Sequence, residues 1–272
     1  MIGWFGLLLF CISGICFILP SWVLGRGLVG SIFFLMSVQF YLSYGIYVQF
    51  ADIPRRWRRY WVYFFAPGVV LHELSHAVVA RWMGGKLERL VLFNPREDLL
   101  FLGEVSFHLP LDRWVSWKAI CIGLAPYFGC GGGLLALIYF FAGLEIFDIS
   151  LWLTRTERGI GELLIAFSVL FPKLFFSSSH FIVIKIIWLW GCFSLAQGAA
   201  PSWQDLRVCY QVGSRLDFFL AVVFSFLFML GVFSFFPLVG GAVLLIFYCI
   251  VGAQFCVLMM LVVGRWILVK WG

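Results

Sequence analysis

Long apolar runs limit what this chain can fold into. A helix needs about 20 residues to cross the hydrocarbon core of a bilayer, and several runs reach that length. Strands of a membrane barrel would instead appear as short segments of alternating polarity. We therefore expect an all-α, multi-pass membrane protein, a bundle of about seven transmembrane helices. The predicted spans are residues 2 to 24, 28 to 50, 61 to 83, 117 to 142, 174 to 200, 216 to 236 and 239 to 264.

The composition agrees with a membrane protein and argues against a nucleic-acid partner. Of the 272 residues, 63% are apolar and only 12% are charged, which is far from the balance of a soluble domain. The net charge is +6, but the basic residues stand at the ends of apolar runs, where they anchor helices at lipid headgroups. We therefore expect contact with the lipid bilayer and no nucleic-acid binding. The eight cysteines show no paired spacing, which favours packing roles.

The sidedness of the predicted bundle stays open. The side that holds residues 84 to 116 carries more basic residues than the opposite side, which favours a cytoplasmic location for it. The dense cluster Arg55, Arg56, Arg58 and Arg59 lies on the other side and argues for the reverse orientation.

One segment between two predicted spans is not helix-like. Gly84 and Gly85 end a helix, and residues 87 to 93 and 100 to 109 form two strand-like runs around a turn. We expect a small β-hairpin insertion within residues 84 to 113, after the predicted span from residue 61 to 83; the alternative is an irregular surface loop. A sheet edge exposed to lipid is not tolerated, so the strands should lie at the interface or against protein.

The apolar run from residue 64 to 80 carries three ionisable side chains, His72, Glu73 and His76. Such groups at membrane depth cost several kcal/mol unless they pair or bind something. Residues four apart share one face of a helix, so both histidines can direct a ring nitrogen to one metal ion. Glu73 is placed to take a proton from a zinc-activated water, as in His-Glu-x-x-His metalloproteases. The alternative is a polar triad that hydrogen-bonds between helices.

A catalytic zinc ion usually takes three protein ligands and leaves one position for water. Asp205 is the best candidate for the third ligand, because Pro201 and small residues break an apolar helix just before it. Irregular backbone at membrane depth lines polar sites. The alternative for Asp205 is a helix cap at the start of a solvated loop. His108 and His180 are better explained as interfacial residues than as ligands.

These residues together resemble a divergent branch of the site-2 protease family of intramembrane zinc metalloproteases. The resemblance covers about residues 61 to 217 and rests on His72-Glu73-Leu74-Ser75-His76 in a membrane helix, a hairpin-like insertion and a distant aspartate. It implies that His72, His76 and Asp205 bind Zn²⁺ and that Glu73 acts as the general base.

Other parts of the chain agree with the family less closely. The family's aspartate motif has a glycine after the aspartate, where this chain has Leu206, although Pro201-Ser202-x-x-Asp205 looks like the form found in the divergent branch. Gln197 stands where an asparagine of the family helps to hold substrate backbone. Gly123-Leu124-Ala125-Pro126 is similar to the start of the glycine-rich helix that packs near the metal helix, and packing through small residues explains it equally well.

The resemblance implies a zinc-dependent intramembrane endopeptidase that cleaves a membrane-embedded protein substrate, in the plasma membrane or a bacterial inner membrane. Other membrane subunits are further candidate partners. By analogy with strand addition, the hairpin would pair with an unwound substrate helix, and proline at Val91 or Val105 should impair cleavage. The alternatives are a zinc hydrolase that acts on a lipid amide or ester, and a non-catalytic membrane scaffold or assembly partner with a structural or vestigial metal site.

The same reading predicts one membrane domain over residues 1 to 272. An N-terminal helical hairpin would occupy residues 1 to 60, and the metalloprotease core residues 61 to 217. A C-terminal helix pair would occupy residues 216 to 272.

Overall fold

The longer elements are six helices and one hairpin in the part of the chain that a computed structural model describes. The described residues are 7, 9–14, 26–95, 102–110, 112, 114–142, 182–200, 205, 220, 223–224, 227, 232 and 237–271. The helices are α2 (Arg26–Ala51), α3 (Arg55–Trp82), α4 (Val115–Gly123), α5 (Ala125–Ala142), α8 (Ile182–Gly198) and α11 (Pro237–Trp271), and the strands are β1 (Lys86–Val91) and β2 (Glu104–His108).

Four helical stretches within these residues are long and apolar enough to cross a membrane. They are Val29–Ala51, Trp57–Trp82, Val115–Phe140 and Cys249–Trp266, and α8 is a shorter apolar helix. The mostly helical character and the membrane-spanning lengths are therefore confirmed. The spans predicted at residues 2 to 24 and 216 to 236 lie largely outside the described residues, so the total of about seven stays a prediction.

The predicted span from residue 117 to 142 matches the apolar helical stretch Val115–Phe140, although this stretch is not one continuous helix. It consists of α4 and α5, which meet at Leu124. Pro126 lies in the first turn of α5 and has no backbone N–H, so it cannot continue the hydrogen-bond ladder of α4. The break leaves backbone carbonyl groups of the last turn of α4 available to other donors.

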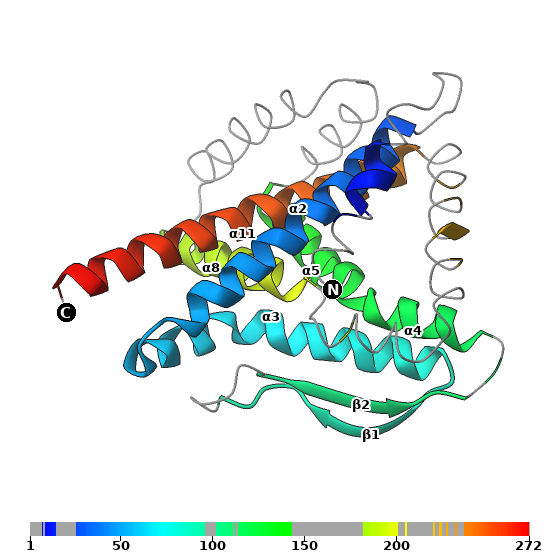
Figure 1. Cartoon of the computed structure of the whole chain (residues 1–272), viewed down its shortest axis with the longest axis horizontal. Coiled ribbons are helices and arrows are strands. Elements are labelled where there is room, and N and C mark those ends of the chain that lie inside the picture. The colour runs from blue at the N-terminus through cyan, green and yellow to red at the C-terminus, as the bar shows by residue number, and fades with distance from the viewer. Residues whose placement is uncertain are drawn as a thin grey trace.

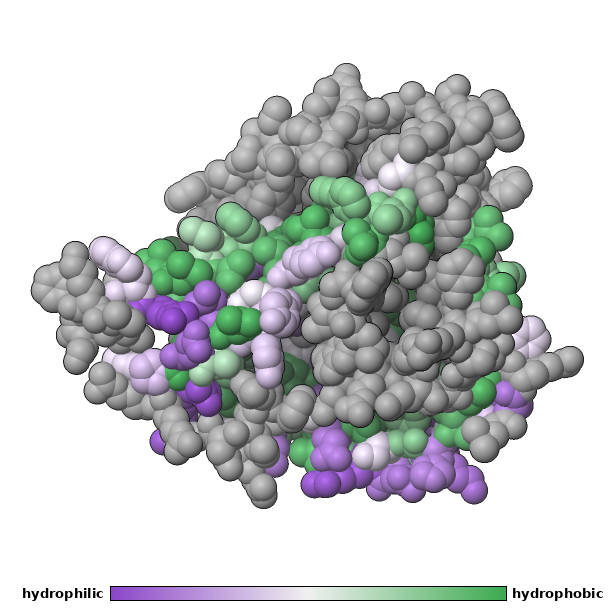
Figure 2. Space-filling model, viewed as in Figure 1, coloured by the Kyte–Doolittle hydropathy of each residue, from purple (hydrophilic) through white to green (hydrophobic). Residues whose placement is uncertain are grey.

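The predicted β-hairpin is confirmed as an antiparallel two-stranded sheet. Its register runs from the pair Lys86 and His108 to the pair Val91 and Glu104, with an irregularity between Leu87 and Arg89. The hairpin follows α3 closely because the chain reverses at Gly84, whose φ of 80° is a left-handed conformation that glycine adopts at little cost. The hairpin runs along the length of α3 (Figure 1). Figure 2 shows hydrophilic residues gathered over it, as expected for strands outside the lipid core.

Helix α3 lies between the hairpin and the remaining helices (Figure 1). It packs against α5 and α8, while α2 and α11 pack against each other. The pair α2 and α11 is tied at one end by Arg265, whose Nη1 lies 2.8 Å from Asp52 Oδ2 and 3.2 Å from Gln49 Oε1. The packing of α3 leaves His72 and His76 buried and Glu73 half-buried.

Candidate metal centre

Helices α3 and α8 are parallel and joined by three evenly spaced hydrogen bonds. Trp190 Nε1 donates to the carbonyl of Phe64 at 2.8 Å, the N–H of Gly68 donates to Ser194 Oγ at 2.8 Å, and His72 Nδ1 lies 2.6 Å from the carbonyl oxygen of Gly198. In each pair the two residues are 126 positions apart. Successive bonds are four residues apart on both helices, so each turn of α3 faces one turn of α8.

Two glycines let the backbones of α3 and α8 meet. A Cβ atom at Gly68 would lie 1.9 Å from the carbonyl oxygen of Ser194, and one at Gly198 would lie 2.3 Å from the carbonyl oxygen of Gly68. Real Cβ atoms do not approach backbone this closely, so glycine is required at both positions. Such close contact through small residues is typical of helices packed in membranes.

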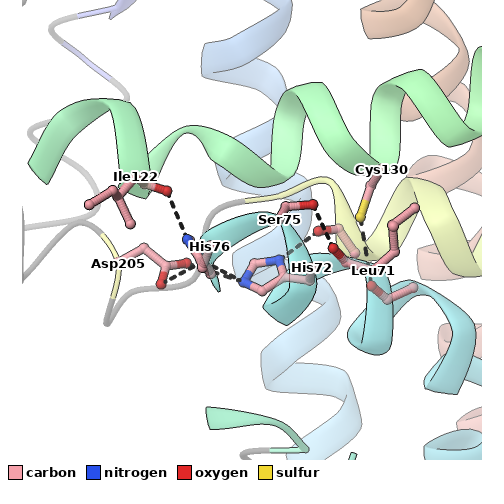
Figure 3. A network of polar contacts seen from close by, with 9 residues as sticks. Leu71, His72, Ser75, His76, Ile122, Cys130 and Asp205 are labelled. Carbon is pink, nitrogen blue, oxygen red and sulfur yellow. Dashed lines mark hydrogen bonds and ion pairs between the residues drawn. The ribbon is translucent and has the colours of Figure 1, made fainter. Parts of the chain in front are cut away.

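The structure brings together the three residues that the sequence predicts as ligands. His76 Nε2 lies 3.1 Å from Asp205 Oδ1, His72 Nε2 lies 3.4 Å from Asp205 Oδ2, and the two Nε2 atoms are 3.1 Å apart. Both histidines are buried and Asp205 is nearly so. Figure 3 shows the two imidazoles and the carboxylate pointing toward one another. The group can hold a metal ion.

Backbone carbonyls orient both imidazoles. His72 Nδ1 faces the carbonyl oxygen of Gly198, at the end of α8, and His76 Nδ1 lies 2.7 Å from that of Ile122 in α4 (Figure 3). The Ile122 oxygen is available because Pro126, one turn later, has no N–H to donate to it. A carbonyl only accepts, so Nδ1 carries the proton in both rings and each Nε2 presents a lone pair.

Lone pairs therefore face one another at the centre of this site. Two Nε2 atoms and a carboxylate within hydrogen-bond distance repel each other unless a cation lies between them or an imidazole takes up a second proton. Burial raises the pKa of the Asp205 carboxyl, but when an imidazole takes up the second proton its hydrogen bond to Asp205 outweighs the burial and holds that pKa below its usual range. Asp205 is thus an ionised donor, and the set fits a divalent cation.

Glu73 is half-buried on α3, beside the ligands but not among them. It lies within electrostatic range of His72, His76 and Asp205. On its other side it faces the start of β2, because a Cβ atom at Gly103 would meet the end of its side chain. The carboxylate is therefore held between the metal group and the hairpin.

The other residues singled out in the sequence lie in the hairpin, in α8 or outside the described residues. Val91 pairs with Glu104 and Val105 with Leu90, so both valines belong to the hairpin. Gln197 directly precedes Gly198 in α8, and its Oε1 atom is buried and has no hydrogen-bond partner among the described residues. His108 is exposed and its Nδ1 lies 3.3 Å from Glu88 Oε1 in the hairpin, so it is not among the three converging groups. His180 and Pro201 lie outside the described residues.

Sequence reasoning did not identify the groups that orient the ligands. The carbonyls of Gly198 and Ile122 carry no signature of their own, although the helix end at Gly198 and the position of Pro126 point to free carbonyls there. Gly103 was also missed, since a lone glycine beside a strand has many explanations.

Comparison with known proteins gives no match to a family model, a curated protein or a solved structure. The interpretation of the site therefore depends on its own geometry.

Proposed function

We propose that the protein is a zinc-dependent intramembrane endopeptidase, which hydrolyses a peptide bond of a membrane protein. The convergence of His72, His76 and Asp205 in a membrane helix bundle supports this most directly. Ionisable side chains at membrane depth are costly and serve a function in most cases. A site with three donors and an adjacent carboxylate fits metal-dependent hydrolysis.

The donor set favours zinc. Two imidazoles and one carboxylate suit this ion, and donors bound at 2.0 to 2.2 Å in a tetrahedron lie about 3.3 Å from one another. The two Nε2 atoms are 3.1 Å apart, and they lie 3.1 and 3.4 Å from different oxygens of Asp205, so the three groups are close enough to share one ion. Two histidines and a carboxylate also bind Fe²⁺ in oxygenases. Glu73 favours hydrolysis, because a hydrolytic site needs a base beside its ligands and an oxygenase site does not.

The residues of the chain divide the chemistry between them. A bound zinc ion would polarise the substrate carbonyl and lower the pKa of water to about 7. Glu73 takes the proton from the attacking water and passes it to the leaving amine. The carbonyls of Gly198 and Ile122 hold His72 and His76 in the tautomer that ligates through Nε2.

The hairpin is the candidate substrate-binding element. The carbonyl of a helical peptide is hydrogen-bonded and shielded, so cleavage requires an extended substrate. A strand edge near Val91 and Val105 can bind such a segment by strand addition. Gln197, whose buried Oε1 lacks a partner among the described residues, is a candidate for holding the backbone of the substrate on the other side. The plasma membrane or a bacterial inner membrane is the proposed location.

Metal analysis combined with cleavage tests the proposal. Zinc is measured in the purified wild type, Glu73→Gln and Asp205→Ala, and each is assayed against single-span membrane proteins and against lipid amides and esters. Full zinc with lost proteolysis in Glu73→Gln supports the endopeptidase, and loss of zinc in Asp205→Ala supports the third ligand. Cleavage of lipids alone would favour the lipid hydrolase. Absence of cleavage by the wild type at full metal content would favour the non-catalytic scaffold. Cleavage by Glu73→Gln at the wild-type rate would exclude Glu73 as the general base, and iron in place of zinc would overturn the assigned chemistry.

A further inference from the structure

Gly103 lies against the side chain of Glu73. It stands immediately before β2, and a Cβ atom at this position would lie 2.4 Å from Glu73 Cγ, 2.6 Å from Oε1 and 2.8 Å from Cδ. Carbon atoms in ordinary contact are about 3.5 to 4.0 Å apart. The side chain of Glu73 thus occupies the space that any side chain at position 103 would need.

The backbone on both sides of Gly103 is held in place. Leu102 packs against the apolar cluster formed by the first half of α3 with α2 and α11, and its carbonyl accepts the N–H of Asn94 at 2.7 Å. Glu104, on the other side, pairs with Val91 in the sheet. The strand therefore has little freedom to retreat, whereas the Glu73 side chain can turn about its own single bonds. A methyl group added at position 103 would move the carboxylate and leave the strand where it is.

We propose that Gly103 positions Glu73 as the general base. The segment that leads into β2, a strand of the proposed substrate-binding hairpin, would then also fix the position of the catalytic carboxylate. This inference rests on the proposed hydrolase function and names a residue that controls it. The atoms nearest to a Cβ at position 103 all belong to Glu73, so Gly103 would act through Glu73 and is a positioning residue. A carboxylate displaced by one methyl group is out of reach of the attacking water while the metal site is unchanged.

The test compares Gly103→Ala with Gly132→Ala, since a Cβ atom at Gly132 in α5 meets nothing within 4 Å. Both variants should keep the zinc content of the wild type. Gly103→Ala should lower kcat for a membrane substrate by roughly 100-fold with KM unchanged, the loss expected for a displacement of about 1 Å. Gly132→Ala should cleave like the wild type. Equal cleavage by the two variants, or loss of zinc in Gly103→Ala, would overturn the inference.

A second measurement does not depend on cleavage. Gly103→Ala should lower the thermal unfolding midpoint of the wild type, because the added methyl group crowds Glu73. The same change should have no effect in a Glu73→Ala background, where the crowded atoms are gone. If Gly103→Ala lowers the midpoint equally in the wild type and in Glu73→Ala, the two side chains do not compete for the same space and the inference is wrong. If the wild type cleaves nothing, the hydrolase proposal fails, and the midpoints still decide whether Gly103 constrains Glu73.

Discussion

His72 is tied to Gly198, the last residue of α8, by a hydrogen bond of 2.6 Å from its Nδ1 atom to the carbonyl oxygen. The bond joins the first predicted ligand to the helix that precedes Asp205 in the chain. Gly68 and Gly198 let the two helices come close enough for it to form. The separation of α3 and α8 therefore controls whether the three donor atoms converge.

Gly68→Ala should separate α3 from α8. The added Cβ atom would lie 1.9 Å from the carbonyl oxygen of Ser194, which is backbone and cannot rotate away. We expect a loss of about 1 to 3 kcal/mol in the free energy of unfolding, as for other overpacked sites, together with reduced zinc binding. Denaturant unfolding in detergent and metal analysis measure both. Gly45→Ala is the control, because its Cβ would make ordinary contact with Leu258 at 3.5 Å; similar behaviour of the two variants would contradict the prediction.

Pro126→Ala should weaken metal binding. It restores a backbone N–H one turn after Ile122, and this donor competes with His76 for the Ile122 carbonyl oxygen. Loss of such an orienting contact typically lowers metal affinity by about 10- to 100-fold. Competition with a zinc chelator of known affinity measures the change. Ile122→Val is the control, since it shortens a buried side chain without adding a donor; a loss of affinity in both variants would point to packing as the cause.

Helical spacing and hydropathy allowed much of this fold and site to be predicted. An α-helix places His72 and His76 on one face whatever surrounds them, and the apolar run around them is long enough to cross a membrane. The β-hairpin was also predicted, from the glycine turn at Gly84 and the two strand-like runs that follow it. Asp205 was predicted because the helix before it is broken, and the structure places its carboxylate beside both imidazoles.

Features that depend on tertiary contact were not predictable. The break at Leu124 was missed because the run from residue 117 to 142 is apolar apart from Lys118 near its start. A proline alone does not decide such a break, since Pro67 lies inside α3 without ending it. The three hydrogen bonds between α3 and α8 join residues 126 positions apart. The sequence of either helix alone does not indicate which helix it packs against. The groups that orient the imidazoles are backbone carbonyls, which every residue has. Residue types therefore do not indicate which carbonyls accept these hydrogen bonds, and the fold is needed to identify them.

Removing the metal should destabilise the protein. Without a cation, two imidazole lone pairs and a carboxylate face one another at 3.1 to 3.4 Å. A ligand bound only to the folded state raises the free energy of unfolding by about 2.7 kcal/mol when its free concentration is 100 times Kd. Chelation should therefore lower the thermal midpoint, and added zinc should restore it. Asp205→Ala should show little response to the chelator, whereas a wild-type midpoint that ignores chelation would argue against a structural contribution from any bound ion.

Val105→Pro should impair cleavage and leave zinc in place. Val105 pairs with Leu90 in the hairpin and is not one of the three candidate ligands, and proline removes the backbone N–H at this position. If the hairpin binds an extended substrate through its backbone, the loss of a donor or of local pairing should lower kcat/KM for membrane substrates. Val105→Thr is the matched control, because it keeps the N–H, the β-branched shape and the strand preference. Val91→Pro should behave like Val105→Pro. Cleavage at the wild-type rate by both proline variants, measured on the same single-span substrate at full zinc occupancy, would exclude the hairpin as the substrate-binding strand, because neither position could then contribute to an extended backbone pairing.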